Sequence, residues 1–193
     1  MLKNLLLLSS LLLLVAQPVF AASYKIDPAH SEVEFTVDHL MIFKVSGFFT
    51  DFAGTIEADP ETKALNSVSA TIQTTSVDTR IEKRDNHLRS PDFFDVAKYP
   101  EMNFVSKKVE GSGTNIKVHG DLTIRGITQA VVLEGGYQGQ NKDAWGNVRA
   151  GFAAKTKISR KDFGLTWNAL LESGGVTVGD EVEINLQIQG IQQ

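Results

Sequence analysis

The chain has 193 residues, a formal charge of −4 at pH 7 and no cysteine. It carries no cluster of basic residues, which argues against binding to nucleic acid or to anionic membrane surfaces. Without cysteine it can form neither disulfides nor thiolate metal sites, and it cannot be anchored as a lipoprotein. A stable fold must therefore rest on its core alone.

The first 21 residues have the order of a secretory signal peptide. Lys3 supplies a positive charge, an apolar run follows from Leu5 to Val15, and Ala21 offers a small residue for cleavage. The run is much shorter than the roughly 20 residues of a membrane-spanning helix, although an uncleaved anchor is the alternative. We expect a signal peptide over 1–21, a periplasmic location and one mature domain over 22–193. Removal of Lys3 brings the formal charge of that domain to −5.

Most of the remaining chain alternates between apolar and polar residues with a period of two, which predicts strands with one apolar and one polar face. The alternating runs lie at 33–37, 52–56, 68–72, 102–104, 116–124, 148–158 and 182–188. Turn residues separate them, such as Gly111-Ser112-Gly113, Gly135-Gly136 and Gly146-Asn147. We expect eight or nine antiparallel strands in a closed barrel or a sandwich.

The polar face of these strands distinguishes two kinds of barrel. It is rich in Glu, Lys and Gln, which lipid would reject, so the chain is not expected to span a membrane. An eight-stranded barrel with an apolar interior is either filled by side chains or able to hold one small ligand. Small interior residues are expected to leave unfilled volume, and these are Gly54, Ala58, Ala70, Gly120, Ala150 and Ala154.

The connection over residues 38–49 is more apolar than an ordinary loop. Next to His39 it contains Leu40, Met41, Phe43 and Phe48. Exposed apolar patches mark binding surfaces, and Met and Phe adapt well to an irregular lipid tail. The alternative is that the segment folds over the barrel rim as ordinary core.

Strand periodicity breaks over residues 74–100, where a charged helical insert is predicted. Thr79 and Glu82 have the spacing of a capping box, so a first helix should begin at Arg80. Ser90-Pro91 should open a second short helix, because proline is favoured in the first turn.

Apolar and charged side chains of this insert are candidates for contact with a ligand. Leu88, Phe93 and Phe94 could dock on one end of the barrel, as a plug or as the lining of a pocket mouth. An Asp can orient a His and an Arg can pair with phosphate, which directs attention to Arg84, Asp85 and His87. The sequence has no G-x-S-x-G or H-E-x-x-H motif. Structural ion pairing is therefore the first interpretation, contact with a head group the second and catalysis the third.

The insert closely resembles the signature of the YceI-like family of secreted polyisoprenoid-binding proteins. The matching elements are Ser76-Val77-Asp78-Thr79, Arg84-Asp85, His87-Leu88-Arg89-Ser90, Asp92-Phe93-Phe94-Asp95, and Tyr99-Pro100 followed by Phe104. Further matches at 24–27, 38–49 and 120–128 extend the resemblance over the mature chain. Gln129 stands where the family usually has a Lys-Pro pair, at a position expected to be a turn.

The resemblance implies a mainly β fold, an antiparallel eight-stranded lipocalin-like barrel with a short helical insert. Such a protein would bind, transport or store a long-chain isoprenoid lipid in the periplasm, either an isoprenoid quinone such as ubiquinone or a polyprenyl pyrophosphate. It would be a binding protein rather than an enzyme, without cofactor or metal, and a homodimer stays open. The expected tail contacts are Phe35, Leu40, Met41, Phe43, Phe48, Leu88, Phe93 and Phe94, and the head-group candidates are His39, Arg84, Asp85 and His87.

Two alternatives come from other classes of protein. One is an enzyme that acts on an isoprenoid lipid through Asp85 and His87. The other is a stress-induced structural barrel whose interior is fully packed and holds no ligand.

Overall fold

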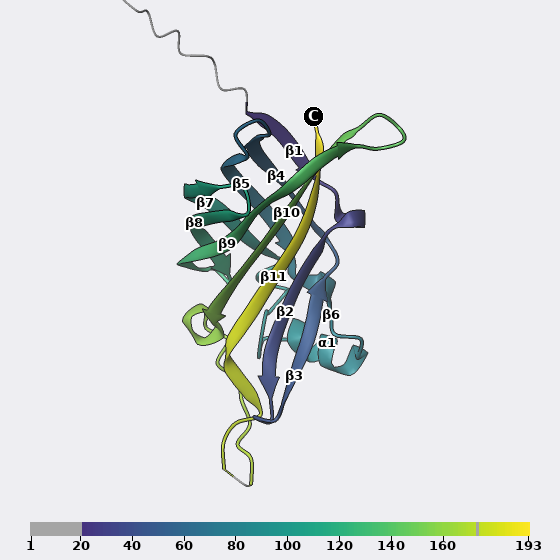
Figure 1. Cartoon of the computed structure of the whole chain (residues 1–193). Helices are drawn as coiled ribbons and strands as arrows, with labels where there is room; N and C mark the ends of the chain where they lie inside the picture. Colours follow the sequence, from purple (N-terminus) through teal and green to yellow (C-terminus); the bar gives the residue numbers. More distant parts are fainter. Residues whose placement is uncertain (1–20, 173) are drawn as a thin grey trace, which may run out of the picture.

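The computed structural model describes residues 21–172 and 174–193, and most of them lie in β-strands (Figure 1). The predicted signal peptide lies outside these residues except for Ala21. The strands are β1 (Ala22–Ile26), β2 (Glu32–His39), β3 (Phe43–Phe49), β4 (Phe52–Asp59), β5 (Ala64–Gln73), β6 (Val77–Asp78), β7 (Glu101–Ser112), β8 (Asn115–Ile124), β9 (Ile127–Lys142), β10 (Val148–Ser159) and β11 (Val178–Gln192). The helical elements are α1 (Glu82–Arg89) and the short 3-10 helices η1 (Pro28–His30), η2 (Thr74–Ser76) and η3 (Arg160–Phe163).

Eight of the strands close into an antiparallel barrel. Around the ring they follow the order β1-β4-β5-β7-β8-β9-β10-β11, and β11 pairs with β1 to complete it. The closing pair is short, with Tyr24 opposite Gln192 and Ile26 opposite Gly190. The predicted fold, a mainly β, eight-stranded antiparallel barrel with a short helical insert, is confirmed.

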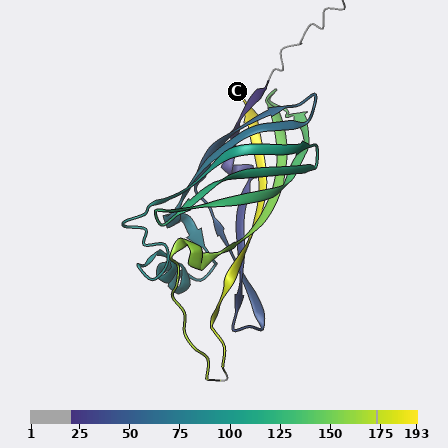
Figure 2. The ribbon, with the colours of Figure 1, turned by 90° about the vertical axis from the view of Figure 1, so that its left-hand side faces the viewer.

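The barrel wall divides at its other end. From Gln187 back to Val178, β11 pairs with β2 instead of β1, and β2 pairs along its length with β3. β3 in turn meets only two residues of β6. This splayed end, the lower end in Figures 1 and 2, is where α1 lies beside β6.

The period-two alternation sorts side chains between the interior and the outer face as predicted. In β8, Ile116, Val118, Leu122 and Ile124 are buried, whereas Lys117 between them is exposed. Burying each such side chain contributes about 1.5–3 kcal/mol. The alternating segments therefore supply the core that a chain without disulfides requires.

The glycine pair at 135–136 is not the turn that the sequence suggested. Both residues lie inside β9, which the alternation did not identify. Gly135 pairs with Ala154, and a Cβ on Gly135 would collide with the carbonyl oxygen of Ala153. The glycines are needed because the neighbouring backbone approaches closely. The turn before β9 is instead at Arg125-Gly126, which both have positive φ, as a two-residue hairpin turn requires.

The predicted turn at Gln129 is also wrong, because this residue lies in β9. Its side-chain amide donates a hydrogen bond to the carbonyl oxygen of Asp162, at 3.0 Å. Gln129, which stands where the family usually has a Lys-Pro pair, therefore makes a contact between the barrel wall and η3.

Aromatic rings fill the closed end of the barrel. Tyr24 and Tyr137 each meet Phe152 edge to face, with ring centroids 5.9 and 5.6 Å apart. Tyr24 is fully buried and its hydroxyl donates to Gln140 Oε1 at 2.9 Å. Burial raises the pKa of both tyrosine hydroxyls. These rings form a floor beneath the interior.

Several of the small interior residues do not leave the volume that we expected of them. A Cβ on Gly120 would lie 2.5 Å from Phe104 Cζ, so the phenyl ring already occupies that space. A Cβ on Gly54 would meet the carbonyl oxygen of Ser69, and Ala58 and Ala150 are buried. These four small residues permit close packing, whereas Ala154 lines a small open space inside the barrel.

The insert has one helix, and it begins later than predicted. α1 begins at Glu82, Ile81 precedes it without a side-chain cap, and Arg80 has a φ of 66°. The hydroxyl of Thr79 is bonded to Asp85 rather than to a helix N–H. The prediction of a second helix is also wrong, since residues 91–98 form consecutive turns. These turns are tied to the barrel where Arg125 Nη1 donates to the carbonyl oxygen of Phe93 at 2.7 Å.

Candidate functional site: an apolar cavity and its vestibule

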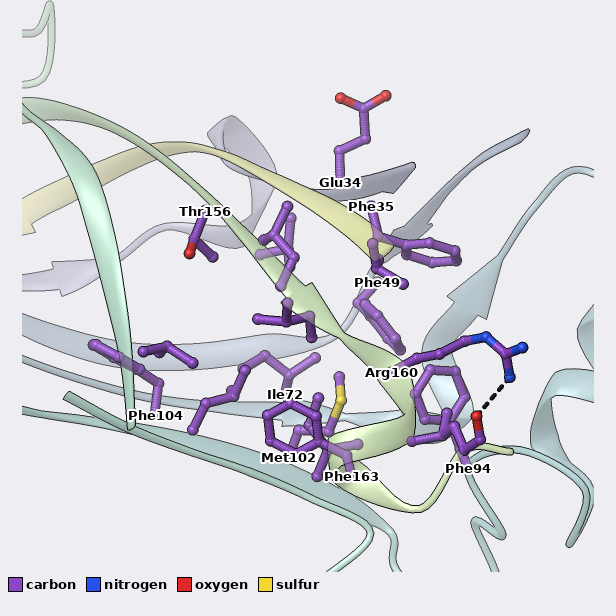
Figure 3. Close-up of a pocket in the computed structure, with 18 of the residues that line it drawn as sticks. Glu34, Phe35, Phe49, Ile72, Phe94, Met102, Phe104, Thr156, Arg160 and Phe163 are labelled. Carbon is purple, nitrogen blue, oxygen red and sulfur yellow. Dashed lines mark hydrogen bonds between the residues drawn. The ribbon is translucent and has the colours of Figure 1, made fainter. Parts of the chain in front are cut away.

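A cavity of about 200 Å³ lies inside the splayed half of the barrel (Figure 3). Its walls come from strands on all sides of the barrel, from α1 and from the turns that follow it, and nearly all of the lining is apolar. The lining residues are Val33, Glu34, Phe35, Val37, Phe49, Val68, Ile72, Leu88, Phe93, Phe94, Met102, Phe104, Leu122, Ile124, Val131, Leu133, Thr156, Ile158, Arg160, Phe163, Leu165, Val178, Val182, Ile184 and Leu186. We refer to this space as the apolar cavity.

Three phenyl rings form one side of the apolar cavity. Phe49 lies 5.6 Å from Phe35 and 5.5 Å from Phe94, measured between ring centroids. The strands β2 and β3 supply the first two rings, and the turns after α1 supply the third. The insert is therefore part of the cavity wall.

Arg160 is the charged group buried in this lining. Its Nε donates to the carbonyl oxygen of Gly179 at 2.8 Å, and its Nη1 donates to those of Leu165 and Trp167 at 2.5 and 2.9 Å. Its Nη2 reaches Asp180 Oδ1 at 3.3 Å. Burial lowers the pKa of the guanidinium, and the Asp180 carboxylate opposes that shift. Through these bonds Arg160 holds the connection between η3 and β11 in place.

A second, smaller space continues the apolar cavity toward the floor. It measures about 60 Å³ and shares Val68, Leu133 and Leu186 with the apolar cavity. Phe152, part of the floor, also lines it. The open volume therefore narrows toward the closed end of the barrel.

A more polar space of about 200 Å³ lies on the other side of the cavity wall. We refer to it as the vestibule. It shares Phe35, Val37, Leu88, Phe93 and Val178 with the apolar cavity. The rest of its lining is Asp38, His39, Val45, Thr79, Arg84, His87, Trp167 and Thr177.

His87 stands between two aromatic rings in the vestibule wall. Its imidazole meets Phe93 and Trp167 edge to face, with centroids 5.0 and 4.7 Å away, and its Nε2 lies 2.9 Å from Asp92 Oδ2. The other charged partner considered from the sequence, Asp85, is not in contact with it. The two residues are two apart in α1, a spacing that places side chains on different faces of a helix.

Asp85 is buried and has a structural role. Its Oδ1 accepts hydrogen bonds from the N–H and the hydroxyl of Thr79. Arg84 then donates through Nε to the hydroxyl oxygen of Thr79 at 2.7 Å and through Nη2 to its carbonyl oxygen at 2.8 Å. These bonds hold the turn before α1 and position Arg84 at the vestibule.

The structure brings together some of the predicted contact residues and separates others. Phe35, Leu88, Phe93 and Phe94 line the apolar cavity, and His39, Arg84 and His87 line the vestibule. Asp85 lines neither space. The same is true of Leu40, Met41, Phe43 and Phe48, of which Met41 and Phe43 are exposed.

The reason for this separation lies in strand geometry. Phe48 points to the outer face of β3, where the Arg80 guanidinium lies 5.6 Å from its ring centroid, and its neighbour Phe49 points inward. Phe43 shares the parity of Phe49 but lies at the start of β3, beyond the barrel. The prediction of a connection over residues 38–49 is wrong for residues 43–49, which form β3, and no sequence pattern showed where the barrel ends.

Sequence analysis also missed lining residues from later in the chain, notably Phe163 and Trp167. Phe163 is in η3, and Trp167 is in the connection to β11 that Arg160 holds. Neither belongs to an alternating run, so a period-two pattern could not identify them.

Across residues 21–172 and 174–193, no three or more His, Asp or Glu side chains are grouped closely enough to hold a metal ion. None of the helices in these residues is long and apolar enough to cross a membrane.

Comparison with known proteins relates the barrel to one family. The sequence pattern of the YceI-like domain matches residues 24–190. The chain is 42% identical to Protein YceI of Escherichia coli O17:K52:H18 over 184 residues, which is 94% of this chain and 93% of that protein. A crystal structure of the Campylobacter jejuni YCEI protein is 33% identical, with a TM-score of 0.70 over 81% of this chain and 90% of that one.

A more distant structure shares the fold alone. It is a polyisoprenoid binding domain from Saccharophagus degradans, 14% identical, with a TM-score of 0.59 over 89% of this chain and 99% of that domain.

Proposed function

This chain belongs to the YceI-like family, and from that premise we propose that it binds an isoprenoid lipid inside its barrel and carries or stores it in the periplasm. The ligand would be an isoprenoid quinone such as ubiquinone or a polyprenyl pyrophosphate. The observation that carries the proposal is the pairing, across one shared wall, of an almost wholly apolar cavity with a vestibule whose lining includes the polar side chains of His39, Arg84 and His87. A prenyl lipid has the same division into an apolar tail and a polar head.

The apolar cavity supplies the affinity for the tail. Each methylene removed from water contributes roughly 0.8 kcal/mol, and binding sites of this type are largely apolar with a few polar groups that fix orientation. The rings of Phe35, Phe49 and Phe94 would lie along the tail. The polyisoprenoid binding domain of Saccharophagus degradans has the same fold.

The vestibule supplies the contacts for the head. His39, Arg84 and His87 offer hydrogen-bond donors there, and Asp38 adds a carboxylate to the same lining. Two N–H groups of Arg84 are already bonded to Thr79. A carboxylate repels a pyrophosphate, whereas a neutral quinone carbonyl only needs a donor, so this lining favours the quinone.

The arrangement supports binding rather than catalysis. The pair that an enzyme would use, Asp85 and His87, is not assembled, since Asp85 is bonded to Thr79 and His87 to Asp92. A packed structural barrel is disfavoured by the open volume inside.

The two tryptophans of the chain provide the test. Trp167 lies in the vestibule wall, and Trp145 is 84% exposed in the hairpin between β9 and β10, at the opposite end (Figure 1). Trp145→Phe leaves Trp167 as the sole reporter, and Trp167→Phe leaves Trp145. Quinones quench indole fluorescence at short range, so we would titrate both variants with ubiquinone carrying two isoprene units.

Saturable, stoichiometric quenching of Trp167 together with weak, linear quenching of Trp145 is the expected result. Equal, linear quenching of both would contradict ligand binding in the barrel and favour the packed structural barrel. Recovery of the quinone chemically unchanged would separate a binding protein from an enzyme.

A further inference from the structure

Four large apolar side chains are exposed at the splayed end of the molecule. Met41 is 69% exposed, Ile42 83% and Phe43 73%, all at the turn between β2 and β3, and Leu170 is 87% exposed in the connection that leads to β11. We refer to these four residues as the apolar tip. Figure 2 shows both segments projecting beyond the barrel in the same direction, away from the C-terminus.

The two segments of the apolar tip are held together. The backbone N–H of Leu40 donates to the carbonyl oxygen of Thr177 at 2.8 Å, and the Met41 side chain lies against Gly175. Leu170 pairs with Val176 in the same connection. The tip is therefore one surface built from two parts of the chain.

The turn at the tip has a sequence that turn geometry alone would not select. Leu40 and Met41 have φ angles of 55° and 60°. Turns with two positive φ angles favour Asn and Gly, because a larger side chain in this region is sterically strained. Apolar residues at these two positions carry a conformational cost as well as the cost of exposure, and strain of this kind is concentrated at functional segments.

The apolar tip is continuous with the mouth of the lipid site. Asp38 and His39, at the end of β2, and Thr177, in the connection bonded to Leu40, line the vestibule. A partner surface that contacts the apolar tip would therefore lie next to the vestibule, separated from it by a single turn of the chain.

The size and charge of the tip indicate what it contacts. A large side chain presents on the order of 200 Å², so the tip offers on the order of 600 Å² of apolar surface, less than the about 800 Å² per partner of a stable protein interface. Lys44 beside it is paired with Glu183 at 2.7 Å, so attraction to anionic head groups is weak. Glu172, in the same connection as Leu170, is also exposed, so the tip has no excess positive charge. A small, projecting, apolar surface of this kind suits shallow insertion among lipid acyl chains.

We infer that the apolar tip inserts into the surface of a lipid bilayer and sets the vestibule against it, so that a prenyl lipid passes between membrane and barrel without crossing water. This inference rests on the proposed function and adds its partner, the membrane that supplies or receives the lipid. A second copy of this chain is the competing occupant.

Site-specific fluorescence tests the contact directly, because the chain has no cysteine of its own. Phe43→Cys and, as a matched control at the far end, Trp145→Cys would each carry an environment-sensitive fluorophore. With vesicles of phosphatidylcholine, the label at 43 should shift to the blue in a salt-independent way, while the label at 145 does not move. No shift at 43, or equal shifts at both positions, would overturn the inference. A shift at 43 that depends on protein concentration without vesicles would overturn it in favour of a dimer.

The rate at which the protein takes up lipid from vesicles distinguishes a failure of the membrane contact from a failure of the proposed function. The double variant Ile42→Ser/Phe43→Ser should take up ubiquinone from phosphatidylcholine vesicles at least about tenfold more slowly than wild type, and Trp145→Ser should match wild type. Short-tail ubiquinone added in solution should quench Trp167 equally with and without the double substitution, when both proteins also carry Trp145→Phe. Unchanged uptake from vesicles with normal quenching would overturn the membrane contact alone. If ubiquinone does not quench Trp167 even without the double substitution, the proposed function itself would be contradicted.

Discussion

Thr79 and Asp85 are joined by two hydrogen bonds to a single oxygen. The Thr79 N–H lies 2.8 Å from Asp85 Oδ1, and the Thr79 hydroxyl lies 2.5 Å from the same atom. Both residues are buried. The bonds fix the turn that leads into α1, and α1 contributes Leu88 to the wall shared by the apolar cavity and the vestibule.

Asp85→Ala should therefore destabilise the protein strongly. It leaves two buried donors of Thr79 without their acceptor, and each unsatisfied buried group costs about 1–3 kcal/mol. We expect the free energy of unfolding, measured in urea, to fall by about 2–4 kcal/mol. Asp92→Ala is the matched control, because Asp92 is more than half exposed and should change stability by about 0.5 kcal/mol or less. Equal effects of the two substitutions would contradict a structural role for Asp85.

Tail length should control affinity only up to a limit set by the open volume. A cavity of about 150 Å³ holds one benzene ring. Since the head is assigned to the vestibule, the apolar cavity and the smaller space beyond it are left for the tail, and by that measure they shelter on the order of 10 carbons, or about two isoprene units.

Affinity for ubiquinone homologues should rise at least about tenfold from the first to the second isoprene unit and then level off. Quenching of Trp167 in the Trp145→Phe variant measures it. A continued rise through six units would show that the rings of Tyr24, Tyr137 and Phe152 do not form a fixed floor. Affinity independent of length from the first unit would contradict tail binding in the cavity.

The carboxylate of Asp38 should discriminate between head groups. It lies in the vestibule lining and is exposed, and a like charge about 4 Å away costs on the order of 1 kcal/mol in water. Asp38→Asn should strengthen binding of farnesyl pyrophosphate about threefold to fivefold and leave ubiquinone binding unchanged. Asp51→Asn, at an exposed position outside the vestibule, should alter neither. An equal effect on both ligands would place the head elsewhere.

Acid stability should depend on an ion-pair network at the opposite end of the barrel. Arg149 Nε lies 2.7 Å from Asp143 Oδ2, and its Nη1 lies 2.6 Å from Asp27 Oδ2. The hydrogen bonds from Arg149 hold the pKa of both carboxyls below the usual range. A carboxyl whose pKa is lower in the folded state stabilises the fold above its unfolded pKa of about 3.9, and that contribution is lost as pH falls toward the folded value.

The free energy of unfolding of wild type should therefore fall steeply from about pH 4 downward. Asp143→Asn should be less stable than wild type at pH 7 and should lose stability more gradually below pH 4, as measured by urea unfolding across the acid range. Parallel curves for the two proteins would show that the network contributes nothing to acid sensitivity.

The barrel could be predicted because each strand is encoded by a pattern of neighbouring residues in the sequence. Alternation in segments such as 116–124 reports directly which side of a strand is buried, and it held in the structure. The Gly135-Gly136 pair was wrongly predicted to be a turn, because glycine is favoured both in turns and where two strands approach closely. Only the position of the partner strand, at Ala153 and Ala154, shows that the second explanation applies here.

The site was predictable only in part, because its walls depend on contacts distant in sequence. Composition identified Phe93 and Phe94 in the insert as cavity candidates, and both line the cavity. Trp167 reaches the vestibule because Arg160 binds the carbonyl oxygens around it, a relationship that no sequence pattern expresses. Phe43 failed as a cavity residue because the hairpin extends beyond the barrel.

Native mass spectrometry of the protein purified from its own periplasm, followed by extraction and identification of any lipid, tests the central proposal most directly. We expect a chain that begins at Ala22 and carries one prenyl lipid, with a quinone head favoured. A protein that is isolated empty and takes up no added quinone would contradict it.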